Sequence, residues 1–149
     1  MILMLTDEEL NSLNEEDIDW KIHYVLDDFD FKTDRCDAHT HGVSKDHLEL
    51  QVTICLDPDT MGYILNVLGL LIRKGYKFTD GDLLFGLFED ESMALGFKEI
   101  TNYDNKPILR IIVPDEKGNV YVGAEGIFGE QEDTPYTEEA EYEYIQREM

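Results

Sequence analysis

The chain has 149 residues, enough for one domain that buries about 68–70% of the surface of its unfolded form, so it needs neither a metal nor a disulfide for stability. Its 34 acidic and 12 basic residues give a net charge of −22, which disfavours direct binding to nucleic acid or to an anionic membrane, because both require clustered Lys or Arg. Its longest apolar run, residues 61–72, is shorter than the ~20 residues that a bilayer span needs.

The two cysteines, Cys36 and Cys55, form no metal-type or disulfide-type spacing, which favours a reducing cytoplasm. The first ten residues lack the basic start and the small-residue cleavage site of a signal peptide. We therefore expect a cytoplasmic protein with a single domain over residues 1–149.

The first half of the chain predicts one helix followed by strands. Thr6 is an N-cap candidate for a short helix to about Leu13. Residues 19–29 alternate as in a half-buried strand. Lys21, His23 and Val25 lie on one face, and the other face is apolar or aromatic: Trp20, Ile22, Tyr24 and Leu26. Residues 38–43 are a candidate second strand. A third strand over residues 47–56 has five apolar residues on one face: Leu48, Leu50, Val52, Ile54 and Leu56.

A long apolar helix comes next, with Asp57 as N-cap, Pro58 in the first position and Gly75 just past its end. Because it is apolar on nearly all sides, we expect it to be the central buried helix. One stripe of the helix is entirely apolar: Met61, Ile64, Leu65, Leu68 and Ile72.

Residues 83–88, 92–100 and 106–113 read as further strands, residues 114–119 as a hairpin turn and residues 120–123 as a short returning strand. A capped acidic helix is expected from Thr137 to the C-terminus. The predicted fold is α+β, with an antiparallel-rich sheet packed on one central buried helix and short N-terminal and C-terminal helices.

The segment DAHTHG, residues 37–42, is the strongest candidate for chemistry. In a strand, His39 and His41 leave the same face about 6.6–6.8 Å apart, so their imidazoles can converge on a divalent transition metal. Such a site needs further ligands, and the nearby candidates are His23, Cys36, Asp37, His47 and Glu49. Two alternatives stay open, because histidines also fix loops by hydrogen bonds or line a pocket for a small molecule or a partner.

Other motifs are excluded. Residues 57–62 mimic the start of an EF-hand, but Met61 and Leu68 occupy positions that require oxygen ligands. The sequence has no phosphate-binding glycine loop and no serine nucleophile elbow. No catalytic residue is assigned.

Several short motifs occur in order: WKIHYV, DAHTHGV, HLELQVTICL, YILNVLGLLIRKGYKFTDGD and PILRIIVPD. Together they resemble the bacterial domain-of-unknown-function 4262 family over about residues 18–116, and leave an acidic extension over about residues 120–149 outside the match. The resemblance implies a shared fold core and site location, and it implies no activity. Its family-like positions are His23, Tyr24, His39, Thr40, His41, Gly42, His47, Glu49, Gln51, Asn66, Gly75, Phe78 and Gly81.

Two functional hypotheses follow. The first is a non-enzymatic binding or inhibitor protein, of the immunity or anti-defence type, whose acidic ends engage a basic protein partner: residues 1–40 carry 12 acidic and 3 basic residues, and residues 115–149 carry 11 and 2. The alternative is a small-molecule-binding or metal-binding domain, with hydrolase activity as one option, whose pocket is lined by His23, Tyr24, His39, Thr40, His41, His47 and Glu49. An exposed strand edge would also allow a homodimer.

Overall fold

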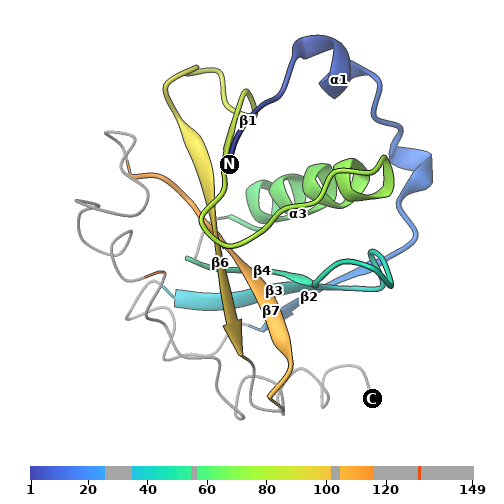
Figure 1. Cartoon of the computed structure of the whole chain (residues 1–149). Helices are drawn as coiled ribbons and strands as arrows, with labels where there is room; N and C mark the ends of the chain where they lie inside the picture. Colours follow the sequence, from blue (N-terminus) through green and yellow to red (C-terminus); the bar gives the residue numbers. More distant parts are fainter. Residues whose placement is uncertain (26–34, 55–56, 102–104, 116–130, 132–149) are drawn as a thin grey trace.

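The structure, a computed structural model, describes residues 1–25, 35–54, 57–101, 105–115 and 131 (Figure 1). These residues form a seven-stranded mixed sheet with one main helix packed on it, an α+β fold. The strands are β1 (Ile2–Met4), β2 (Lys21–Val25), β3 (Arg35–His41), β4 (Leu50–Ile54), β5 (Leu83–Phe85), β6 (Ala94–Thr101) and β7 (Pro107–Ile112). The helices are α1 (Asp7–Asn11), the single turn η1 (Glu15–Asp17) and α3 (Pro58–Arg73).

The sheet order is β1-β5-β6-β7-β4-β3-β2. Two antiparallel groups, β2-β3-β4 and β5-β6-β7, are joined by the parallel pairing of β4 with β7. β1 adds at the far edge, parallel to β5. The sheet is therefore antiparallel-rich but mixed, and β2 and β1 are its two edges.

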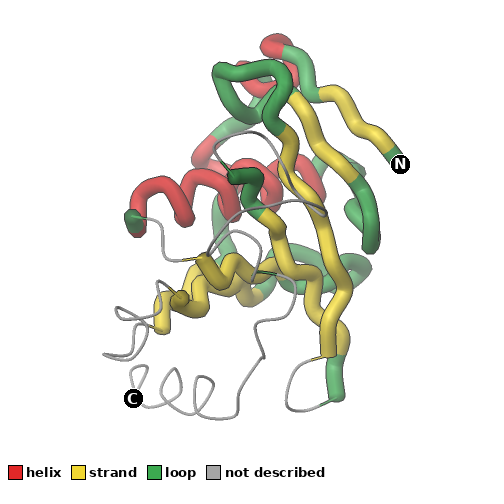
Figure 2. Tube along the Cα trace, turned by 90° about the vertical axis from the view of Figure 1, so that its left-hand side faces the viewer, coloured by secondary structure: helices red, strands yellow, loops and turns green. Residues whose placement is uncertain are grey.

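Helix α3 lies across one face of the twisted sheet (Figures 1 and 2). It begins as expected: the Asp57 side chain accepts a hydrogen bond from the Thr60 backbone N–H, and Pro58 takes the first turn, where no N–H is needed. It ends at Arg73, with Lys74 as its C-cap, and the next residue is Gly75, whose φ of 108° is accessible to glycine at little cost. The predicted apolar stripe is buried in full: Met61, Ile64, Leu65, Leu68 and Ile72.

β2 and β4 confirm that strands lie in these two regions, with Ile22 and Tyr24 packed against the core and Leu50 and Val52 within it. Both strands begin later than expected, β2 at Lys21 rather than residue 19 and β4 at Leu50 rather than residue 47. The second strand differs from its expected bounds of 38–43, since β3 begins at Arg35 and ends at His41. The chain leaves the sheet at Gly42, where φ is +93°.

The N-terminal region forms β1, which was not predicted, and a helix shorter than expected. β1 is three residues long and is fixed by pairing with β5, about 80 residues away in the sequence. α1 has the capping box expected from Thr6 but spans only five residues, ending at Asn11 rather than about Leu13. Most of the hairpin turn and of the acidic extension lies outside the described residues, as do the strand over residues 120–123 and the C-terminal helix.

The middle of the sheet face opposite α3 is also buried, and it is polar. Because side chains alternate along a strand, Asp37, His39, Gln51 and Arg110 all leave this second face, and each is less than a tenth exposed. His39 pairs with Gln51, and Gln51 pairs with Arg110, so these residues form a row across β3, β4 and β7. Among the described residues, no helix is long and apolar enough to cross a membrane.

Candidate metal centre

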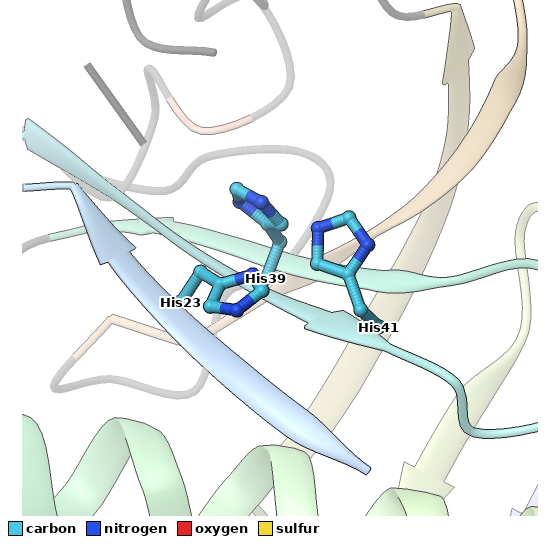
Figure 3. Close-up of side chains that lie close together, drawn as sticks. All are labelled: His23, His39 and His41. Atoms are coloured by element: carbon cyan, nitrogen blue, oxygen red, sulfur yellow. The ribbon is translucent and has the colours of Figure 1, made fainter. Parts of the chain in front are cut away.

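Three histidines converge at the β2–β3 end of this second face. In the antiparallel pairing of β2 with β3, His23 lies directly opposite His39, and His41 follows two residues along β3. The ring centroids are 5.7 Å apart for His23 and His39, 4.6 Å for His23 and His41, and 4.9 Å for His39 and His41. One ring nitrogen from each histidine lies within 4.8 Å of the others. Figure 3 shows the three rings on the side of the sheet that faces away from α3.

The three histidines differ in exposure. His39 is buried, His23 is partly buried and His41 is exposed. The cluster is therefore anchored inside the protein at one end and reaches solvent at the other. Within the described ranges, no other group of three His, Cys, Asp or Glu side chains lies this close together.

A carboxylate orients the buried member of the cluster. Asp37 Oδ1 lies 2.7 Å from His39 Nδ1, and both side chains are buried. The ionised carboxylate can only accept, so His39 Nδ1–H donates to it, and Nε2 becomes the nitrogen that would face a metal. A ligating histidine is commonly fixed by a carboxylate in this way, which also makes the ring a stronger ligand.

Asp37 is in turn held by a buried network that runs to the middle of the sheet. Gln51 Nε2 donates to Asp37 Oδ1 over 3.1 Å, and Gln51 Oε1 accepts from Arg110 Nε and Nη2 over 3.0 and 2.9 Å. Arg110 is fully buried and also donates from Nη1 to the backbone carbonyl of Gln131. The Gln51 amide thus lies between the buried side chains of Arg110 and Asp37. Each of these partners fixes one end of the amide, Arg110 the oxygen and Asp37 the nitrogen.

Two of the predicted pocket residues lie on the helix face instead. Tyr24 and Thr40 alternate with His23 and His39, so their side chains point toward α3. The Tyr24 hydroxyl donates to the Pro58 carbonyl over 3.3 Å, and burial raises the pKa of this phenol, helped by the nearby Asp59 carboxylate.

Thr40 Oγ1 accepts the backbone N–H of Leu50 over 3.0 Å, which ties β3 to the start of β4.

His47 and Glu49 lie in the connection between β3 and β4 and hold it in place. Glu49 accepts the backbone N–H groups of Gly42 and Val43 over 2.8 and 3.2 Å. His47 Nε2 accepts the N–H of Phe78 over 3.0 Å, so Nδ1 carries the proton and donates to the Leu48 carbonyl over 2.8 Å. For His47, the structure therefore favours the loop-fixing alternative. Neither residue belongs to the histidine cluster.

The sequence named His39 and His41 as metal ligands and His23 only as one of several candidates for the third position. What singles out His23 is the register of β2 against β3, which no local pattern in the sequence specifies. The Asp37–Gln51–Arg110 network was also missed. The sequence did contain a sign of this network, because Gln51 and Arg110 are long polar residues inside mostly apolar strands, LQVTI and PILRII.

Comparisons with known proteins give no relative. No protein-family model matches the chain, and neither a curated protein nor a solved structure does so. The resemblance to the domain-of-unknown-function 4262 family therefore stays a prediction.

Proposed function

We propose that this protein binds a divalent transition metal, with zinc the best-suited ion, through His23, His39 and His41. The observation that carries the proposal is the convergence of three imidazoles from two paired strands within 4.8 Å, with the Asp37 carboxylate behind the buried ring. Imidazole nitrogen is the donor that zinc and its neighbours in the transition series favour.

The geometry requires only a small closure around the ion. With Zn–N bonds of about 2.0–2.1 Å in a tetrahedral site, the three nitrogens would stand about 3.3 Å from one another. They lie within 4.8 Å in the structure, so ring rotations and shifts of about 1 Å bring them into place. His41 is exposed and can make most of this movement, whereas Asp37 holds His39 still.

Three protein ligands would leave a fourth position on the metal, and the exposure of His41 supports a fourth position that is open to solvent. Structural zinc sites usually close with four protein ligands, whereas sites with three ligands and a bound water are typical of hydrolytic and hydration chemistry. Bound zinc lowers the pKa of such a water to about 7 and so supplies a nucleophile at neutral pH. The proposed class of activity is therefore metal-assisted attack of water on a small substrate.

The direct test is metal content by inductively coupled plasma mass spectrometry on tag-free protein, followed by zinc titration of the metal-free form. We expect one metal per chain in the wild type and none retained in His41→Ala, which changes an exposed side chain and should fold normally. His23→Ala should behave in the same way.

The matched control is His47→Ala, which removes a histidine outside the cluster. It should lose stability yet keep one metal per chain. Equal metal loss in His41→Ala and His47→Ala, or a wild type that binds no zinc, would contradict the proposal.

A further inference from the structure

A groove lies on the other side of the sheet, between α3 and the segment that contains α1 and η1. Its volume is about 820 Å³, within the size range of ligand-binding pockets. Apolar side chains such as Leu13, Ile18 and Val67 outnumber the polar ones in its lining, and the polar ones include Glu15, Asp59 and Asn66. This groove faces away from the histidine cluster, because Tyr24 leaves the opposite face of β2 from His23.

The groove is long rather than compact. Its wall on α3 runs from Pro58 to Leu70, and at 1.5 Å per residue these positions are about 18 Å apart along the helix axis. This span equals about 12 residues of a second helix laid alongside. Tyr63 stands half-exposed midway along it, with 53% of its surface accessible. An elongated apolar groove of this kind fits a segment of polypeptide better than a compact small molecule.

Charge selects the kind of segment. The first 20 residues supply one wall and carry seven acidic and no basic residues. Glu15 and Asp59 stand exposed at the groove itself, one on each wall. An acidic segment would be repelled from both walls, whereas Lys or Arg side chains flanking an apolar stripe would meet carboxylates on either side.

We propose that this groove binds a basic amphipathic helix of a partner protein. The apolar stripe of that helix packs between α1 and α3, and its basic residues pair with Glu15 and Asp59, the acidic rim of the groove. The proposal stands independently of the metal site, which lies on the opposite face of the sheet. It assigns a specific role to some of the acidic residues of the chain, which is to bind the basic residues of the partner.

The probe is a synthetic 14-residue peptide with Leu at helical i, i+3, i+4 spacing and Lys elsewhere, titrated into the full-length protein in the presence of a chelator. Trp20, the only tryptophan, reports occupancy because its Nε1–H donates over 2.9 Å to Asn66, which lines the groove. Calorimetry run in parallel detects binding even if the fluorescence does not change. We expect saturable one-to-one binding, and no binding of a peptide with Glu in place of Lys.

Two charge-reversed double variants separate the groove from general attraction. Glu15→Lys with Asp59→Lys should weaken binding at least about tenfold, because it places like charges on both sides of the peptide. Asp46→Lys with Glu91→Lys makes the same change in net charge at exposed positions outside the groove and should alter the affinity less than about twofold.

Tyr63→Ala removes an exposed groove side chain and should weaken binding with little effect on folding.

Three results would overturn the proposal. A scrambled peptide of the same composition that binds as tightly would show that only charge is recognised. Equal losses in the two double variants would show that the groove plays no part. Spermine that produces the same Trp20 response and the same dependence on Glu15 and Asp59 would show that the groove takes a small cation rather than a helix.

Discussion

Asp37→Asn is the sharpest perturbation of the proposed metal centre, because it leaves all three histidines in place. The carboxylate accepts from His39 Nδ1 over 2.7 Å and is itself held by Gln51. An asparagine of the same shape can present its amide nitrogen to the ring, in which case His39 takes the other tautomer and Nε2 no longer faces the metal as an acceptor. Loss of such an orienting partner typically weakens metal affinity by 10-fold to 100-fold.

This loss can be read from thermal unfolding with and without zinc. At a free zinc concentration of about 1,000 Kd, binding stabilises the wild type by about 4.1 kcal/mol. The same zinc concentration is only about 10–100 times the Kd of the variant, so the stabilisation of the variant by zinc falls to about 1.4–2.7 kcal/mol. For a chain of this size, the Tm increment produced by zinc should be about 3–10 °C smaller in the variant.

The substitution also disturbs the buried network and so lowers the stability of the variant with or without zinc. Comparing the rise in Tm that zinc produces in each protein cancels this effect. Asp46→Asn, at an exposed position outside the site, should show the full wild-type increment. If Asp37→Asn shows the full increment too, the carboxylate does not orient a metal ligand and the role assigned to Asp37 is wrong.

Further predictions concern α3 and are checked by urea unfolding. Gly69→Ala should destabilise by about 1–3 kcal/mol, because the new methyl group would lie 2.5 Å from the Trp20 ring, which cannot withdraw. Gly62→Ala meets only the movable Tyr24 hydroxyl, at 2.8 Å, and should be neutral or stabilising by up to about 1 kcal/mol. Hydrogen bonds from the Thr60 hydroxyl and amide lower the pKa of Asp57 below 3.8, so its capping contribution is present above that pH and is lost as the pH falls through the lowered pKa. Asp57→Asn should keep the cap without this pH dependence, whereas Asp57→Ala should lose it at every pH; equal pH profiles for Asp57→Asn and the wild type would refute the assignment.

What could be predicted from the sequence follows from how local each signal is. The signals for the ends and the apolar stripe of α3 all lie within one continuous segment, from Asp57 to Gly75, and both features were predicted correctly. The parallel pairing of β1 with β5 depends on contacts between distant segments and has no local signature. β1, with only three residues, was therefore missed.

The candidate site shows the same division. Alternation within one strand already separates Tyr24 from His23 and Thr40 from His39, so the proposed pocket could have been divided between two faces from the sequence alone. Choosing His23 as the third ligand required the pairing register of β2 and β3, and that register is a property of the folded sheet.

The two proposed sites lie on opposite faces of one sheet but share the field of a chain with a net charge of −22. That field raises the local concentration of both divalent cations and basic partners. Added salt should nevertheless separate them. The acidic rim of the groove is exposed and is screened over about 8 Å at physiological ionic strength, so peptide affinity should fall steeply with salt. The metal is held by coordination bonds to imidazoles anchored on buried His39, so zinc affinity should change little over the same range. A steep salt dependence of zinc binding would indicate that the ion sits among surface carboxylates rather than at the histidines.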